Sequence, residues 1–285
     1  VYGEDREDLF YGFGYAVAQD RLFQIEMFRR TFWGRLSEVL GEKLLAFDQG
    51  SRRDNLTLAE IRIQIERLEP ELQIVLRSYA DGINAYISEA LANPSKKLPR
   101  EFHELGFQPE PWSSEDVAAN FLSVMGLFMD VSGELGNASM LHFLKDKYGE
   151  QQGHTMFDDW CWGYDPESPT TVEEPYTLPR ATPVKAQSHL NHELLNAALA
   201  AASKAETRLA REKQARGYLL DWVSYGHPAS YALVVSKGKS STGAPLLLGG
   251  PQFEYQLPSA LHEVGLHGAG IDVVGSTLAG YPFVM

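Results

Sequence analysis

The stretch GHPASYALVVSKGKSSTGAPLLLGGPQFEYQLP, residues 226–258, changes the character of the chain. Two β-favouring apolar runs, 231–236 and 245–248, flank a segment that is rich in Lys, Ser and Gly, as turns are. Two strands of similar length joined by one turn return the chain to the edge where it started. We therefore predict a hairpin that begins at Ser230 and brings Gln252 close to it.

The chain before this hairpin is predicted to be helical from the spacing of its apolar residues. Between Asp8 and Arg30 these residues recur at three-to-four spacing, which is typical of one helix face. Gly12 and Gly14 interrupt this face at a cost of about 1 kcal/mol each relative to Ala. That cost is acceptable where a second backbone must approach closely.

Three further helical segments carry local start or stop signals. A short helix over 34–40 is expected to stop at Gly41, and residues 57–92 predict two helices that are broken near Pro70. Ser113 followed by Asp116, ahead of an apolar run, is a helix-start signature.

Two later segments differ in composition. Five prolines between residues 165 and 183 exclude regular structure there and predict an exposed or wrapping arm. Residues 189–216 are rich in Ala and charged side chains, which predicts a helix. That helix is either an ordinary surface helix or a spacer that is later removed, and the sequence leaves both readings open.

Composition excludes some classes of function. The 285-residue chain has 44% hydrophobic residues, enough for a substantial core. Its formal net charge of −13 argues against nucleic acid as a partner, because phosphate binding needs Lys and Arg. No run approaches the about 18 apolar residues of a membrane span. The chain starts at Val1 without Met and stops in a strand-like segment, so we expect both ends to be cut.

Ser230 lies outside any sequence context of a Ser-His-Asp triad. Another chemistry needs no histidine. If the Ala229–Ser230 bond were cut, Ser230 would carry a free α-amino group whose pKa of about 7.7–8.0 makes it a base for its own hydroxyl. One residue would then supply both nucleophile and base.

Several segments together resemble the penicillin acylase family of N-terminal-nucleophile hydrolases. These segments are GYAVAQDRLFQIEMFRR (14–30), GRLSEVLG (34–41), YADGINAYI (79–87), LKDKYG (144–149), GGPQFEY (249–255), VGLHGAGIDVVG (264–275) and GYPFVM (280–285). The resemblance implies an α/β fold, the four-layer αββα sandwich. It also implies a helical α-subunit over 1–190, a spacer over 191–229 and the start of the β-subunit over 230–285.

The resemblance carries functional residues onto this chain. It implies that self-cleavage frees Ser230 as the nucleophile and that the backbone of Gln252 helps to hold its α-amino group. It implies an aromatic acyl pocket and one carboxylate ligand of a structural calcium ion. The pocket residues are Val124, Phe128 and Phe253, and the calcium ligand is Glu134.

Two residues depart from the family pattern. Tyr231 follows the nucleophile where the family usually has asparagine, which puts self-cleavage in question. Leu127 stands where some members place an arginine beside the pocket, which weakens the expected recognition of the leaving amine. The family's oxyanion hole and its other calcium ligands lie beyond Met285, so this fragment alone is expected to be inactive.

The activity implied is hydrolysis of a small-molecule acyl amide with an arylacetyl side chain, without an organic cofactor. The implied assembly is a heterodimer of α and β subunits cut from one precursor, periplasmic or secreted, with no membrane or nucleic-acid partner. Two alternatives stay open. One is an acylase for aliphatic chains, such as those of acyl-homoserine lactones or cephalosporin side chains, and the other is an uncleaved, inactive homologue that acts as a binding protein.

Overall fold

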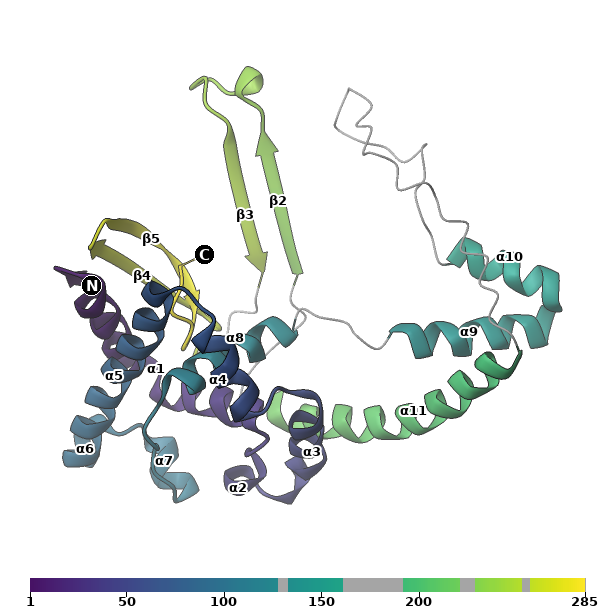
Figure 1. Ribbon diagram of the computed structural model, residues 1–285, viewed down its shortest axis with the longest axis horizontal. Coiled ribbons are helices and arrows are strands. Elements are labelled where there is room, and N and C mark those ends of the chain that lie inside the picture. Colours follow the sequence, from purple (N-terminus) through teal and green to yellow (C-terminus); the bar gives the residue numbers. More distant parts are fainter. Residues whose placement is uncertain (128–132, 161–191, 221–228, 253–256, 285) are drawn as a thin grey trace. The chain divides into compact units, whose positions relative to one another are not determined.

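The computed structural model describes residues 1–127, 133–160, 192–220, 229–252 and 257–284 (Figure 1). It divides into two compact units, Val1–Met129 with Arg211–Met285, and Asp130–Ala210, which we describe separately. Among the described residues no helix is both long and apolar enough to cross a membrane. The predicted proline-rich arm lies outside the described residues.

Helices dominate the first unit. They are α1 (Arg6–Trp33), α2 (Ser37–Leu40), the 3-10 turn η1 (Glu42–Leu44), α3 (Leu45–Asp54), α4 (Leu58–Glu66), α5 (Pro70–Ala92), α6 (Pro94–Lys97), α7 (Arg100–Leu105) and α8 (Ser114–Leu127). The predicted helix over 8–30 and the predicted break near Pro70 are confirmed. The predicted helix over 34–40 is shorter than expected, because Gly34 is left-handed (φ 60°, ψ 53°) and closes α1 instead.

Local capping explains where these helices start. The Thr57 hydroxyl accepts the Glu60 amide while the Glu60 carboxylate accepts the Thr57 amide, a reciprocal cap at the start of α4. Ser113 and Asp116 make the same exchange ahead of α8. The helix start predicted from Ser113 is confirmed.

Helices α1 and α5 pack so closely that their backbones are in contact. A Cβ on Gly14 would lie 2.0 Å from the carbonyl oxygen of Tyr79, and a Cβ on Gly82 would lie 2.0 Å from that of Tyr11. Only glycine leaves room for such an approach. The close backbone contact expected at Gly14 is therefore confirmed, and Gly82 is its counterpart on α5.

The apolar core is built around this helix pair. Phe13 of α1 meets Tyr79 of α5 edge to face, with ring centroids 5.1 Å apart, and both rings are fully buried. Residues from both helices and from the sheet complete the core, among them Leu9, Val17, Ile25, Leu76, Ile83, Val264 and Leu266.

Charged side chains are buried at the C-terminal half of α1. Glu26 is fully buried and binds Arg29 at 2.5 Å and Arg30 at 2.8 Å. Burial raises the pKa of Glu26, and the two arginines oppose that shift. The guanidinium groups also lie over aromatic rings, Arg29 over Trp112 and Arg30 over Phe107, each 5.1 Å from the centroid.

The network continues to the surface through Glu110. Arg35 binds both carboxylate oxygens of Glu110, at 2.8 Å and 2.9 Å, and Arg30 reaches the same carboxylate at 3.3 Å. The Arg35 hydrogen bonds lower the pKa of Glu110 to about 2. These ion pairs thus link Glu110, in the segment before α8, to arginines at the end of α1 and just after it.

A three-stranded sheet completes this unit. Its strands are β1 (Tyr2–Gly3), β4 (Leu261–Gly268) and β5 (Ile271–Leu278), in the order β1-β4-β5. β1 runs parallel to β4, and β4 pairs antiparallel with β5 from Leu261 opposite Leu278. Gly268 has φ 130° and lies against β1, where a Cβ would sit 1.9 Å from the Gly3 carbonyl oxygen.

The second unit consists of helices in its described residues. α9 (Gly133–Tyr148) and α10 (Glu150–Trp160) are joined at Gly149, whose φ is 82°. Gly153 allows α10 to lie against α9, since a Cβ there would be 2.6 Å from Lys145 backbone atoms. α11 (His192–Leu220) begins in this unit and ends in the first, and it confirms the helix predicted for the Ala-rich segment.

Candidate active site

The strand pair that carries Ser230 matches the predicted hairpin. β2 (Ala229–Val235) and β3 (Leu246–Gln252) are antiparallel, with the 3-10 turn η2 (Lys237–Lys239) between them. Ala229 is opposite Gln252 and Ser230 is opposite Pro251. The prediction that the hairpin brings the backbone of Gln252 close to that of Ser230 is confirmed.

Ser230 is exposed in this hairpin, and its nitrogen belongs to the peptide bond with Ala229. A peptide nitrogen cannot accept a proton at neutral pH, so the residue has no base of its own while the chain is continuous. Pro251, directly opposite, lacks an amide hydrogen and cannot donate to β2. The chemistry predicted for Ser230 therefore requires cleavage of the Ala229–Ser230 bond first.

Tyr231 has a packing role in the hairpin. Its cross-strand partner is Gly250, and a Cβ at Gly250 would lie 2.4 Å from atoms of the Tyr231 ring. The ring thus covers the glycine, a cross-strand arrangement that compensates for the missing side chain. The residue that departs from the family pattern is in this way accommodated within the sheet.

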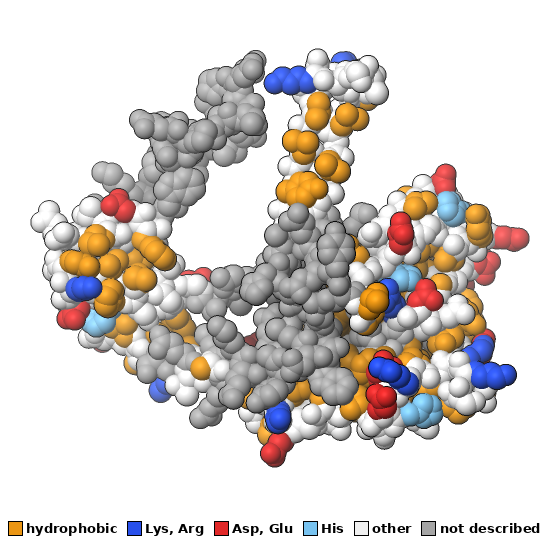
Figure 2. All heavy atoms as spheres, turned by 180° about the vertical axis from the view of Figure 1, so that it is seen from behind, with side chains coloured by type: hydrophobic (Ala, Val, Ile, Leu, Met, Phe, Trp, Pro, Cys, Tyr) orange, Lys and Arg blue, Asp and Glu red, His pale blue; other side chains and the backbone are white. Residues whose placement is uncertain are grey.

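Apolar side chains are exposed on both faces of the hairpin. Val234 is 69% and Leu247 74% exposed, and they are directly opposite each other. Leu233 and Leu248, the neighbouring pair, are also more than half exposed and point to the other face. Figure 2 shows apolar side chains along the strands on the face in view.

The predicted pocket residues are only partly within the described structure. Val124 belongs to α8, which ends at Leu127. Phe128 and Phe253 lie outside the described residues, and Gln252 is the last residue of β3. The acyl pocket as a set of side chains stays a prediction.

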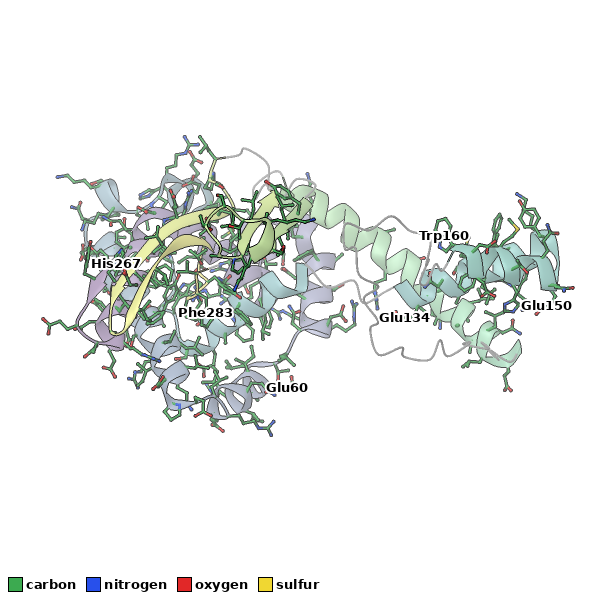
Figure 3. The ribbon with its side chains drawn as sticks, turned by 90° about the horizontal axis from the view of Figure 1, so that it is seen from above. Glu60, Glu134, Glu150, Trp160, His267 and Phe283 are labelled. Carbon is green, nitrogen blue, oxygen red and sulfur yellow. The ribbon has the colours of Figure 1, made fainter. Side chains whose placement is uncertain are left out.

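Glu134 lies in the first turn of α9 and is exposed (Figure 3). A carboxylate there is favoured by the helix dipole, whatever its other role. Calcium takes about six to eight oxygen ligands. Within the described ranges no group of three or more His, Cys, Asp or Glu side chains forms a metal site. Glu134 fits as one accessible ligand, and the calcium site stays a prediction.

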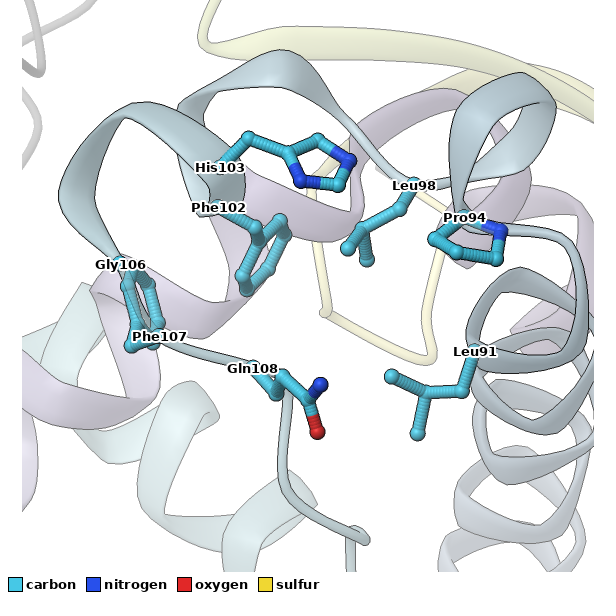
Figure 4. Close-up of a pocket in the computed structure, with 8 residues that line it drawn as sticks. All are labelled: Leu91, Pro94, Leu98, Phe102, His103, Gly106, Phe107 and Gln108. Carbon is cyan, nitrogen blue, oxygen red and sulfur yellow. The ribbon is translucent and has the colours of Figure 1, made fainter.

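A small pocket of about 290 Å³ lies elsewhere in the first unit, at the ends of α5 and α7 (Figure 4). Its volume is just below the roughly 300–1,000 Å³ of ordinary ligand sites. Its walls come from Leu91, Pro94, Leu98, Phe102, His103, Gly106, Phe107 and Gln108. Among the predicted site residues that the structure describes, none lines this pocket.

Sequence reasoning missed one contact that involves α8. Phe121, three residues before Val124, stacks on Tyr281 of the GYPFVM segment, with centroids 4.8 Å apart and planes inclined by 21°. The aromatic residues in both segments were the available signal. Nothing local in the sequence pairs residues that lie 160 positions apart.

Comparison with known proteins identifies relatives over the whole chain. The family model described as Penicillin amidase matches residues 1–285. Penicillin G acylase from Escherichia coli is 38% identical over 305 aligned residues, 99% of this chain and 35% of that protein. Penicillin acylase 2 proenzyme from a Pseudomonas species is 28% identical over 96% of this chain and 31% of its own length. Acyl-homoserine lactone acylase QuiP from Pseudomonas aeruginosa is 35% identical over 47% of this chain and 15% of its own length.

A solved structure supports the fold. Thermostable penicillin G acylase from Alcaligenes faecalis matches with a TM-score of 0.55 and 36% identity, over 61% of this chain and 90% of that chain. The predicted fold class is thereby confirmed. This chain spans only about a third of the length of the E. coli enzyme and of the Pseudomonas proenzyme. With its whole length matched by one family model, the chain belongs to the penicillin amidase family.

Proposed function

We propose that the full-length protein hydrolyses acyl amides and that Ser230 is its nucleophile. The observation that carries the proposal is the position of Ser230 at the head of β2, with the GPQ segment paired opposite it. Membership of a family whose named members are acylases supports it.

Maturation is the first step of the proposed mechanism. The peptide bond between Ala229 and Ser230 breaks and one water molecule is consumed. Ala229 then ends in a carboxylate and Ser230 begins a new chain with a free α-amino group. The products are an α subunit and a β subunit that remain together as a heterodimer. One relative, Penicillin acylase 2 proenzyme, is named as a precursor, which is consistent with such processing.

The mature serine then reacts with the substrate amide. Its hydroxyl oxygen attacks the acyl carbonyl while its α-amino group takes the hydroxyl proton. The amide C–N bond breaks, the leaving amine receives that proton, and the acyl group stays on Ser230 as an ester. Water attacks the ester, releases the carboxylic acid and restores the serine. The backbone of Gln252 helps to hold the α-amino group.

We assign an arylacetyl side chain to the preferred substrate. In this proposal Val124, Phe128 and Phe253 line an apolar pocket, and contacts of the two aromatic rings add about 0.5–1.5 kcal/mol beyond area burial. The similarity to E. coli penicillin G acylase over 99% of this chain favours this class. The match to an acyl-homoserine lactone acylase supports a second candidate, a linear aliphatic acyl chain.

A hydrolysis assay of the full-length protein tests the assignment. We expect cleavage of phenylacetyl anilide in preference to hexanoyl anilide, and no cleavage of either by Ser230→Ala. Phe253→Ala should remove about 1–3 kcal/mol of the aryl preference. Phe143→Ala, at an exposed aromatic residue of α9, is the control and should leave the preference unchanged. A preference for the hexanoyl substrate would establish the aliphatic candidate instead.

Glu134 is proposed as one ligand of a structural calcium ion, and the protein is proposed to be periplasmic or secreted. Glu134→Gln should shrink the loss of melting temperature that a chelator causes, because bound ligand stabilises the native state by mass action. Glu7→Gln is a matched control outside the predicted spacer, since Glu7 is also an exposed acid in the first turn of a helix, α1. If the chelator lowers the melting temperature equally in both variants, Glu134 is not a calcium ligand.

A further inference from the structure

Three aromatic rings form a closed cluster between α8 and the segment after β5. Phe121 stacks on Tyr281 at 4.8 Å and meets Phe283 at 6.0 Å with the planes at 70°. Tyr281 and Phe283 meet at 5.4 Å and 72°. Each ring therefore contacts the other two, and Phe283 lies toward the outside, 37% exposed (Figure 3).

The backbone beneath these rings is held by buried polar groups. Asn120 is fully buried on α8, and its Nδ2 donates to the Ala279 carbonyl oxygen at 3.2 Å. Gly280 has φ 80°, and a Cβ there would lie 2.2 Å from that Nδ2 atom. The buried Thr277 hydroxyl donates to the Tyr281 carbonyl oxygen at 2.9 Å. The turn that follows β5 is thus seated directly on α8.

This junction lies one helical turn from a predicted pocket position. Position 124 follows position 121 by three residues along α8. In the proposed maturation, Phe121 belongs to the α subunit, whereas Tyr281 and Phe283 belong to the β subunit. The cluster therefore connects the two subunits beside the α-subunit wall of the acyl pocket.

We propose that Asn120, Phe121, Tyr281 and Phe283 form a positioning element that fixes α8 against the β subunit and so sets the preference for aryl over aliphatic acyl groups. This inference rests on the proposed function. Phe121 is the ring that α8 contributes, so its loss releases α8 from both other rings, whereas the loss of Tyr281 leaves the contact between Phe121 and Phe283. A rigid phenyl group needs the pocket wall at one distance, whereas a flexible alkyl chain adapts to a displaced wall.

The experiment uses the full-length protein with Phe121→Leu and Tyr281→Leu, singly and combined. We expect the ratio of kcat/KM for phenylacetyl anilide to that for hexanoyl anilide to fall by about fivefold to tenfold, the size of effect that aromatic contacts supply. The change should lie in the KM for the aryl substrate, with kcat within about twofold. The double variant should lose less than the product of the single losses, because both changes break the same contact.

Three further variants separate the positioning role from a general loss of stability. Tyr281→Phe keeps the ring and should keep the wild-type ratio, and Phe283→Leu alters the most exposed ring and should give a smaller loss in the same direction. Phe102→Leu is a matched lesion in a different aromatic cluster, since Phe102 is buried and packs on Phe23 and Phe107. It should lower the melting temperature and leave the ratio unchanged.

Failure of the proposed function and failure of the positioning role give different results. If wild-type protein hydrolyses neither anilide, the proposed function is wrong and the positioning role falls with it. If the wild type shows the aryl preference and the Phe121 and Tyr281 variants keep it, the positioning role alone is wrong. An equal fall of the ratio in Phe102→Leu would reduce the effect to general destabilisation and overturn the proposal.

Discussion

The α1–α5 helix pair and the β2–β3 hairpin differ in how far their apolar side chains are buried. In the helix pair, Phe13 and Tyr79 are fully buried by residues of the same unit. In the hairpin, Val234 and Leu247 remain largely exposed, although their strands are fully paired. Paired strands satisfy the backbone, but burial of their side chains needs further layers. We therefore expect substitutions in the helix pair to affect stability far more than substitutions in the hairpin.

The largest effect is expected at the buried charges of α1. Glu26→Gln removes the fully buried carboxylate that Arg29 and Arg30 share. The remaining acidic partners of the two arginines, Asp116, Glu38 and Glu110, are more exposed, so the loss should still lower the free energy of unfolding by about 3–5 kcal/mol. Glu7→Gln removes an exposed partner of Arg77 and is the control, with a much smaller expected loss. Urea denaturation of both variants measures the difference. Equal losses would show that burial of the network has no energetic consequence.

The next largest effect concerns the closest approach of α1 and α5. Gly14→Ala places a methyl group 2.0 Å from the Tyr79 carbonyl oxygen, so the helices must separate, at an expected cost of about 1–3 kcal/mol. Gly136→Ala lies in α9, where a Cβ meets nothing within 4 Å. There the better helix propensity of Ala should stabilise by up to about 1 kcal/mol. The two substitutions should thus shift the melting temperature in opposite directions, and a shift of the same sign would contradict the packing described.

The lowered pKa of Glu110 predicts that part of the folding stability depends on pH. Its carboxyl pKa is lowered from 4.5 to about 2 by Arg35, so ionised Glu110 stabilises the folded state above the unfolded-state pKa. The side chain is 44% exposed, and solvent screening reduces the expected contribution to about 1 kcal/mol. The stability difference between wild type and Glu110→Gln should be constant above about pH 5 and should vanish as the pH falls toward 2. A difference that persists unchanged at pH 2 would exclude the ion pair as its source.

The smallest effect is expected in the hairpin. Tyr231→Thr keeps a β-favouring residue and removes the ring that covers Gly250, which should cost no more than about 0.5–1 kcal/mol of stability in the 285-residue chain. Val234→Thr, on the opposite face, should cost still less, because Val234 is 69% exposed. Chemical denaturation compares the two. A loss as large as that of Glu26→Gln would mean that the hairpin is part of the core.

The sequence predicted the elements whose signals are local. The apolar period of α1, the proline at the start of α5, the Ser113 cap and the turn between β2 and β3 each reside within a few adjacent residues. The predicted stop of the helix over 34–40 at Gly41 is confirmed, but its predicted start was wrong, because Gly34 closes α1 and α2 begins only at Ser37.

Contacts between distant segments could not be predicted in the same way. Gly14 indicated a close approach, but its partner on α5 is set by the crossing of two helices. The pairing of Arg35 with Glu110 and of Phe121 with Tyr281 likewise has no local signal. The roles of the functional residues were inferred from the resemblance to the penicillin acylase family. The structure adds the strand register, in which Ala229 pairs with Gln252 and Ser230 pairs with Pro251.

The most direct test of the central claim is the N-terminal sequence and intact mass of the purified full-length protein. Our account predicts two chains, of which the larger begins Ser-Tyr-Ala-Leu-Val-Val at Ser230, and it predicts a single uncleaved chain for Ser230→Ala. A wild-type protein that remains one chain would support the inactive homologue, and a second chain that begins at any other residue would contradict the assignment of Ser230.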